Sequence, residues 1–206
     1  MSHLLPLIKR EEIAEKTVAI WLDTLGSDFK FKAGQNVDLN SLRTFSISSS
    51  PNDRDKLRIA FRTSDSDAKK DLFKMPLGTK VKVDGPFGSF ILPKKSDRSI
   101  IMLAGGIGIT PMLSMILDAT ERKLPHKITL VYKNRSLARA VFMDELKQLE
   151  IQNPNFSLRY TLHGMRSINA IYYISGKPGF VSTMRMELEQ AGIDDMAIRT
   201  EEFDGY

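Results

Sequence analysis

The stretch "LAGGIGITPML", Leu103–Leu113, places three glycines within the four positions from Gly105 to Gly108, directly after an apolar run. A buried strand, a glycine turn and the start of a helix account for this order. In such a unit, backbone N–H groups and the positive end of the helix dipole face an anion, and glycine lets a phosphate approach the backbone closely. The stretch therefore predicts a strand–turn–helix unit that binds a nucleotide phosphate.

The predicted helix carries its own start signals. Thr110 is expected as the N-cap and Pro111 as the first helical residue, where a missing N–H leaves no hydrogen bond unmade. The glycine pattern is incomplete, because Gly106-x-Gly108 lacks the third glycine of G-x-G-x-x-G and no acidic residue ends the next predicted strand. From the residues alone, a tight turn without a ligand stays open as the alternative.

The chain after residue 95 follows one pattern. Apolar runs at residues 100–103 ("IIML"), 128–132 ("ITLVY") and 171–174 ("IYYI") alternate with segments whose apolar residues recur three and four apart. Strands that are buried on both faces and alternate with helices form a parallel sheet. Residues 96–206 are therefore predicted to form an α/β domain with a parallel sheet.

The preceding half has a different period. From Lys16 to Phe90 apolar and polar residues alternate, as in "KLRIAFR" at residues 56–62, which is typical of strands with one face in water. One helix interrupts them, because Ser66 or Asp67 can cap "AKKDLFKM" with its start facing an anion. Several short antiparallel strands favour a barrel, so residues 1–95 are predicted to form an antiparallel β-barrel domain.

The composition excludes several kinds of site. The chain has no cysteine, so it cannot by itself build a disulfide, an iron–sulfur cluster or a thiolate zinc site. Its three histidines are scattered, and no metal site is expected. The net charge of +5 comes without a basic motif for nucleic acid, but it can attract an acidic partner protein or an anionic cofactor.

Two apolar segments raise the question of a membrane or targeting signal. No charged residue occurs from Ile100 to Leu117, but the glycines and Pro111 in its middle would break or weaken a spanning helix. The N-terminal apolar run is short and its charges follow it, unlike those of a signal peptide. We therefore expect no membrane span and a cytoplasmic location.

Seven segments in order resemble one family: "FKAGQNVDL", "RTFSISSSP", "GPFGSF", "LAGGIGITPML", "YKNRS", "SGKP" and "EEFDGY". They are similar to segments of the ferredoxin–NADP reductase superfamily, specifically its small flavin- and nicotinamide-dependent oxidoreductases, over roughly residues 5 to 206. The resemblance implies an FAD-binding β-barrel domain followed by an NAD(P)-binding α/β domain. Both implied domains agree with the hydrophobic periods described above for the two halves of the chain.

The resemblance assigns flavin-binding roles to matching positions. Residues Arg43, Thr44, Phe45 and Ser46 match the signature in which an arginine pairs with the flavin pyrophosphate, an aromatic ring lies against the flavin, and a hydroxyl approaches the hydride-accepting atom. Ser66 matches a residue that caps the pyrophosphate, and Phe203 or Tyr206 matches the C-terminal aromatic that shields the flavin. Each has an alternative: Phe45 can be a residue of the barrel core, and Arg43 can be a surface cation. Phe203 and Tyr206 can belong to a frayed C-terminal tail.

The nicotinamide site is assigned in the same way, from residues Gly105, Gly106, Gly108, Thr110, Pro111 and Gly176. Ser175 stands where many members have cysteine, and we expect slower or differently tuned hydride transfer from this change. Lys133 and Arg135 follow the second parallel strand, where they can meet a 2′-phosphate or be ordinary surface residues. The choice between NADH and NADPH stays open.

The implied activity is hydride transfer from NAD(P)H to bound FAD, followed by electron transfer to an external acceptor. Ser46, Ser175 and Glu202, or its neighbour Glu201, are the expected catalytic residues. An acidic ferredoxin or a flavodoxin suits the basic surface, although a ferric chelate, an oxygenase component or free flavin is equally allowed. The alternatives are a non-catalytic docking subunit of a larger redox complex and a nucleotide-binding regulatory module without flavin.

Overall fold

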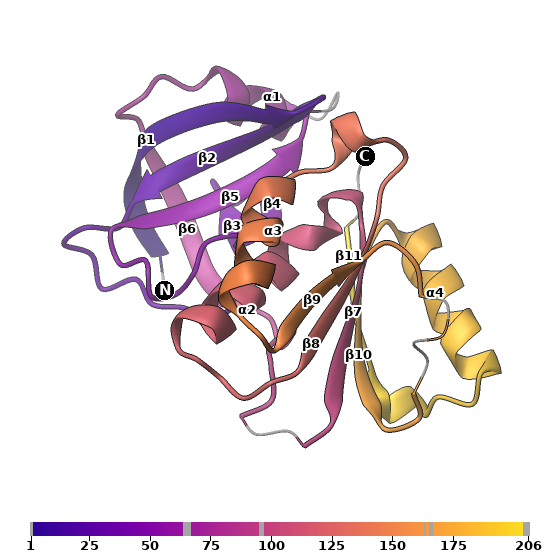
Figure 1. Ribbon diagram of the computed structural model, residues 1–206. Helices are drawn as coiled ribbons and strands as arrows, with labels where there is room; N and C mark the ends of the chain where they lie inside the picture. The colour runs from indigo at the N-terminus through magenta and orange to yellow at the C-terminus, as the bar shows by residue number, and fades with distance from the viewer. Residues whose placement is uncertain (1, 64–66, 95–96, 163, 165–166, 204–206) are drawn as a thin grey trace.

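The computed structural model describes residues 2–63, 67–94, 97–162, 164 and 167–203 and holds two sheets side by side (Figure 1). The first sheet has six antiparallel strands in the order β4-β3-β6-β1-β2-β5. Its elements are β1 Ser2–Ala14, β2 Thr17–Asp23, β3 Asn36–Leu39, β4 Arg43–Ser46, β5 Lys56–Arg62, α1 Asp67–Lys74 and β6 Lys80–Phe87.

The first sheet curls into a barrel around an apolar core. Alternation places Leu57, Ile59 and Phe61 of β5 in this core, together with Val81 and Val83 of β6. An antiparallel bridge between Ile47 and Ile59 joins the region after β4 to β5, which are the two outermost strands of the sheet order. The predicted antiparallel barrel is confirmed.

Strand β1 is the barrel element that sequence reasoning missed. It pairs with β2 on one side and with β6 on the other, and Leu5 stands opposite Val81. Only Leu5 and Leu7 are fully buried along its 13 residues, and near its end Ile13 and Ala14 pack, partly buried, against the core of the parallel half. The sequence of β1, a short apolar stretch followed by charged residues, therefore does not show the alternation of a strand, although β1 lies inside the sheet.

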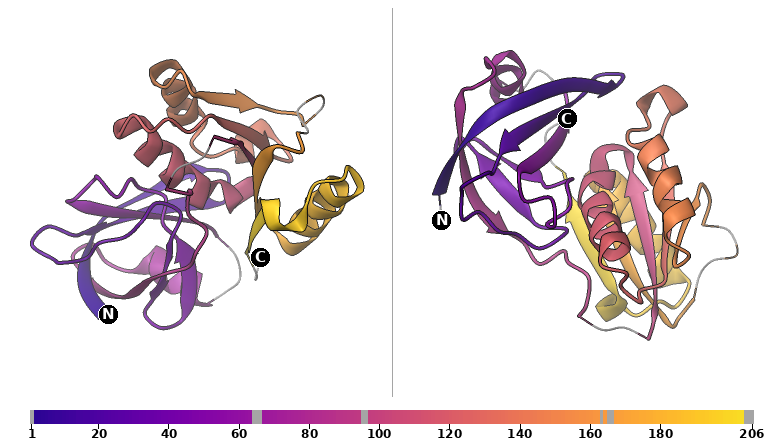
Figure 2. Two further views of the ribbon diagram at one scale, coloured as in Figure 1. Left: turned by 90° about the horizontal axis from the view of Figure 1, so that it is seen from below. Right: turned by 60° about the vertical axis from the view of Figure 1, so that its left-hand side comes forward.

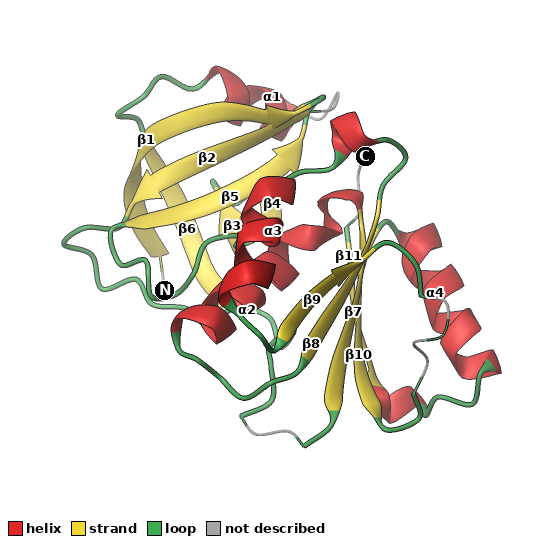
Figure 3. Cartoon of the chain, viewed as in Figure 1, coloured by secondary structure: helices red, strands yellow, loops and turns green. Residues whose placement is uncertain are grey.

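The second sheet has five parallel strands in the order β11-β10-β7-β8-β9. Its strands are β7 Ser99–Gly105, β8 Ile128–Lys133, β9 Phe156–Arg159, β10 Ala170–Gly176 and β11 Ile198–Glu202. Helices α2 Ile109–Glu121 and α3 Met143–Gln152 cover one face, and α4 Pro178–Gln190 covers the other (Figure 3). The predicted parallel α/β half is confirmed.

The uninterrupted apolar runs follow from this double cover. In β7, Ile100 and Met102 pack with α2 and α3, whereas Ile101 and Leu103 pack against α4. Because both faces of the strand are dry, every residue of the run is apolar. The edge strands β9 and β11 were not predicted, since "FSLR" and "IRTEE" contain polar residues that edge positions tolerate.

The predicted domain boundary at residues 95–96 lies outside the described residues. The chain reaches the parallel sheet before that point, because the Phe90 ring packs on Tyr173 with centroids 5.1 Å apart. The Tyr173 hydroxyl also donates to the Ile91 carbonyl oxygen at 2.6 Å.

Polar contacts join the two halves along α2 and α3, and α2 lies where the halves meet (Figure 2). Ser114 of α2 donates to the carbonyl oxygen of Ser49 at 2.7 Å. Arg58 of β5 binds both carboxylate oxygens of Glu145 in α3, at 3.0 and 3.1 Å, and its guanidinium lies over the Phe142 ring. These contacts set the relative position of barrel and sheet, and therefore the shape of the space between them.

We predict that Glu145→Ala lowers the free energy of unfolding by about 1–3 kcal/mol, because it leaves the largely buried Arg58 guanidinium without its carboxylate. Asp144→Ala is the matched control, since it removes a carboxylate from the same helix turn whose ion pair with Lys147, at 3.9 Å, is solvent-exposed. Urea titrations of both variants measure the difference. Equal losses of unfolding free energy in the two variants would show that the Arg58–Glu145 ion pair adds no stability of its own.

Candidate functional site

Two adjoining cavities lie between the barrel and the carboxyl ends of the parallel strands. The first, of about 480 Å³, is lined from β4, β5, α1 and β11, and we call it the barrel cavity. The second, of about 540 Å³, is lined from the ends of β7 and β8 and the start of α4, and we call it the sheet cavity. Arg62 and Ile107 line both, so the two spaces meet. Ligands of parallel sheets bind at this end of the strands.

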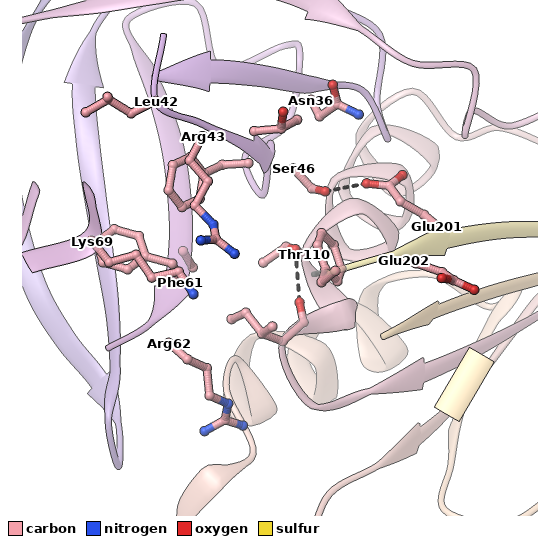
Figure 4. A pocket seen from close by; sticks show the side chains of 15 residues that line it. Asn36, Leu42, Arg43, Ser46, Phe61, Arg62, Lys69, Thr110, Glu201 and Glu202 are labelled. Atoms are coloured by element: carbon pink, nitrogen blue, oxygen red, sulfur yellow. Dashed lines mark hydrogen bonds between the residues drawn. The ribbon is translucent and has the colours of Figure 1, made fainter. Parts of the chain in front are cut away.

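Charge is separated across the barrel cavity (Figure 4). Arg43, Arg62 and Lys69 lie on one side, and Glu201 lies on the other. Phe45 and Phe61 form part of the wall, with ring centroids 5.5 Å apart. Phe45 is at once a barrel-core residue and a wall of the cavity, so the two interpretations of it do not exclude each other.

The acidic end of the barrel cavity contains a hydrogen-bonded pair. The Ser46 hydroxyl donates to Oε1 of Glu201 at 2.5 Å. Burial raises the pKa of Glu201 to about 7, and the Ser46 hydrogen bond offsets part of that rise. Glu202 also lines the cavity, but its carboxylate points away from this pair (Figure 4). Alternation along β11 explains the difference, and it selects Glu201 over Glu202 as the partner of Ser46.

The glycine turn joins the cavities. It is a short 3-10 turn, Gly106–Gly108, that runs directly into α2. A Cβ at Gly108 would lie 2.2 Å from the Ser175 carbonyl oxygen, so only glycine lets the turn rest on β10. Gly106 has a φ of +57° and lines the sheet cavity with Gly105.

The predicted helix start is wrong by two residues. The N-cap is Gly108, so Thr110 and Pro111 are the second and third helical residues. The turn already has helical backbone angles at Gly108, and no side chain caps it. Thr110 instead donates to the Ile107 carbonyl oxygen at 3.0 Å and lines the barrel cavity. Pro111 stays within the first turn, where no intrahelical N–H bond is lost.

The sheet cavity is strongly basic. Its described lining contains no carboxylate and includes five cationic side chains: Arg62, Lys133, Arg135, Arg139 and Lys177. Asn134 also lines it, and its buried Oδ1 has no hydrogen-bond partner among the described residues. An orphaned acceptor among cations fits a ligand that carries both phosphate and hydroxyl groups.

Other predicted residues lie at or behind the walls. Thr44 and Phe203 line the barrel cavity, and the Phe203 N–H donates to the Gly176 carbonyl oxygen at 2.9 Å. Gly108, Pro111, Ser175 and Gly176 are not among the residues that line either cavity. Ser175 is fully buried, and its hydroxyl has no partner among the described residues. Ser66 and Tyr206 lie outside the described residues.

Sequence reasoning did not single out several lining residues: Arg62, Lys69, Asn134, Arg139, Lys177 and Phe180. Lys177 stands inside the "SGKP" segment and Asn134 inside "YKNRS", so both had a signal in the motifs. Arg62 and Lys69 had none, because a basic residue at a strand end or on a short helix is usually solvated.

The residues present fit the two cofactors that the family resemblance implies. Aromatic side chains and a cationic wall in the barrel cavity suit a flavin ring and its phosphate. The glycine turn and basic lining of the sheet cavity suit a nicotinamide dinucleotide. No group of three potential metal ligands occurs among the described residues, and none of their helices is long and apolar enough to span a membrane.

We predict that Gly108→Ala lowers the free energy of unfolding by more than about 2 kcal/mol, because the added Cβ must displace the backbone of β10. Gly179→Ala is the control, since a Cβ there meets no atom within 4 Å. It is expected to change stability by less than about 1 kcal/mol. Thermal unfolding of both variants measures the effect, and two similar melting temperatures would contradict the close approach.

We also predict a pH-dependent stabilisation by Glu201→Gln. The pKa of Glu201 is raised from 4.5 to about 7, so the folded protein retains a proton that the unfolded chain releases. The wild type therefore loses stability as pH rises from about 4.5 to 7, on the order of 1–3 kcal/mol, and the glutamine variant does not.

Urea unfolding between pH 4.5 and 8 measures this difference. Glu202→Gln is the control, because it removes the same charge from a side chain that does not contact Ser46. The same pH-dependent gain in both variants would contradict the assignment to Glu201.

Comparison with known proteins supports nucleotide binding by the parallel half. Residues 102–168 match the family model of the oxidoreductase NAD-binding domain. The chain is 32% identical over 136 residues to one subunit of the Na(+)-translocating NADH-quinone reductase of Pseudomonas aeruginosa, covering 61% of this chain and 33% of the relative. It is 31% identical over 134 residues to the phenol 2-monooxygenase reductase component DmpP of a Pseudomonas species, covering 62% of this chain and 38% of the relative.

A solved structure extends the likeness to the whole fold. The ferredoxin-NADP+ reductase of Plasmodium falciparum superposes with a TM-score of 0.81 at 17% identity, covering 97% of this chain and 95% of that one. At this identity the match shows the fold, with its antiparallel first half and parallel second half. The chain therefore has the fold of a ferredoxin-NADP+ reductase, and its residues 102–168 match an oxidoreductase NAD-binding domain.

Proposed function

We propose that this chain is an NAD(P)H-dependent flavin reductase that passes electrons from bound FAD to an external acceptor. The observation that carries the proposal is the pair of adjoining cavities, which share Arg62 and Ile107. One suits a flavin and the other suits a dinucleotide, so a nicotinamide can lie next to a flavin ring. A bound flavin supplies the chemistry of accepting a hydride and releasing electrons, and the protein supplies binding, orientation and electrostatics.

The barrel cavity provides binding and orientation. The Arg43 guanidinium offers a planar fork to phosphate oxygens, and Phe45 and Phe61 provide an apolar wall for the ring system. Phe203 closes the cavity from the side of the parallel sheet. The hydrogen bond from its backbone N–H to the Gly176 carbonyl oxygen holds Phe203 against β10, the strand that precedes α4.

Ser46 and Glu201 are the proposed proton-handling residues. With a pKa of about 7, Glu201 holds or releases a proton at neutral pH, and the Ser46 hydroxyl contacts its Oε1 atom. Such a pKa suits a group that passes protons in both directions. Ser175 lies behind Gly108, so its proposed influence on hydride transfer acts through the packing of the nicotinamide-binding turn.

The electron acceptor is proposed by its chemical class. The net charge of +5 favours an acidic redox protein such as a ferredoxin or a flavodoxin. The chain spans about a third of the length of the two curated relatives described above. One of those relatives is part of a multi-subunit reductase and the other is a reductase component, so a redox subunit that works only inside a larger complex is the second candidate function.

The visible spectrum of the purified protein tests this function. We expect the absorbance of a bound flavin, and its rapid bleaching when NADH or NADPH is added without oxygen. Arg43→Met is expected to weaken flavin binding at least about 10-fold, since a charge-assisted phosphate contact is lost. Arg54→Met, an exposed position outside both cavities, is the control.

The outcomes separate the candidate functions. A protein that binds no flavin contradicts the proposal. A flavin that binds but is not bleached by either dinucleotide favours the non-catalytic subunit instead.

A further inference from the structure

Lys69 is a buried cation at the edge of the barrel cavity. It belongs to the first turn of α1, and only 6% of its surface is exposed. It lines the barrel cavity together with Arg43, and on its other side it lines a smaller cavity of about 240 Å³. Lysine is rarely buried to this extent, and here it shares a cavity wall with a second cation, so the position suits an anionic ligand.

The charges that face Lys69 come from several elements. Arg43 of β4 and Lys177, directly before α4, repel it. Arg62 of β5 lines the same cavity, and Glu201 lies on the opposite side (Figure 4). Glu12, Lys16 and Lys70 line the smaller cavity on the outer side of α1. Burial, with repulsion by Arg43 and Lys177, lowers the pKa of Lys69 to about 8.

We propose that Lys69 binds the phosphate of the flavin together with Arg43, and that flavin binding is therefore coupled to proton uptake by this chain. The inference rests on the proposed function, since it names a residue of the same flavin site. The ligand chemistry is a phosphate anion, which comes either from the monoester of FMN or from the pyrophosphate of FAD. Riboflavin has the same ring without a phosphate.

The coupling has a definite sign. A phosphate next to Lys69 favours its charged form and so raises its pKa above the value of about 8 in the free protein. At pH 7 and below the lysine is largely protonated already, so it contributes to affinity but makes that affinity vary little with pH. Above pH 8 binding must restore the proton, so affinity falls by up to about tenfold per pH unit. Any slope that comes from Glu201 is shared by riboflavin, so the slope that Lys69 causes is the difference between the phosphate-bearing flavins and riboflavin.

The experiment titrates the flavin-free protein with FAD, FMN and riboflavin between pH 6.5 and 9, followed by flavin fluorescence. At pH 7, Lys69→Met is expected to weaken binding of the phosphate-bearing flavins by about 10- to 100-fold and to leave riboflavin unchanged. Lys69→Arg keeps a cation at all these pH values and is expected to retain affinity but lose the slope. Whichever of FAD and FMN loses more affinity in Lys69→Met is identified as the ligand.

Lys70→Met is the matched control, because it removes the same charge from the adjacent residue, which lines the smaller cavity but not the barrel cavity. Circular dichroism confirms folding, and Lys69→Arg keeps the test valid if the methionine variant does not fold. Unchanged FAD and FMN affinity in Lys69→Met, an equal loss for riboflavin, or a slope that survives in Lys69→Arg would overturn the inference alone. A wild type that binds no flavin at any pH would overturn the proposed function as well.

Discussion

The close approach of Gly108 to the Ser175–Gly176 peptide is the constraint on which the site depends. A Cβ at Gly108 would lie 2.2 Å from the Ser175 carbonyl oxygen and 2.7 Å from the Gly176 nitrogen. Because that atom is missing, the turn after β7 rests directly on β10 and α2 begins at the carboxyl end of the sheet. The same turn presents Ile107, which together with Arg62 lines both cavities, so the two cavities meet beside the turn.

Electrostatics then gives the two cavities different characters. Cationic side chains line the sheet cavity and one side of the barrel cavity, and the opposite side of the barrel cavity holds Glu201 with Ser46. Anionic phosphates are attracted to the basic side, whereas the acidic end suits proton transfer. Separation of these groups keeps Glu201 away from the cations that would lower its pKa, so burial is the dominant effect on it.

Local patterns predicted the two-part architecture and part of the site, but not strands β1, β9 and β11. Apolar runs without alternation predicted the parallel strands, since both faces of β7 are covered, and alternation predicted the barrel strands. Gly105, Gly106 and Arg43 carried motif signals and do line the cavities, whereas Gly108 lies behind them. The helix start was misplaced because a 3-10 turn at Gly106–Gly108 takes the place of a side-chain cap, which no propensity of Thr110 reveals.

The fold class, the order of the two halves and the place of the glycine turn follow from the amino-acid sequence, because each depends on periodicity or on the conformational freedom of neighbouring residues. The choice of Glu201 over Glu202 as the partner of Ser46, a contact across 155 positions, depends on how the folded chain packs. The placement of Lys69 and Arg62 in the cavity walls rather than in solvent depends on the same packing. These choices depend on strand register and on packing between the halves, which residues close in sequence do not specify.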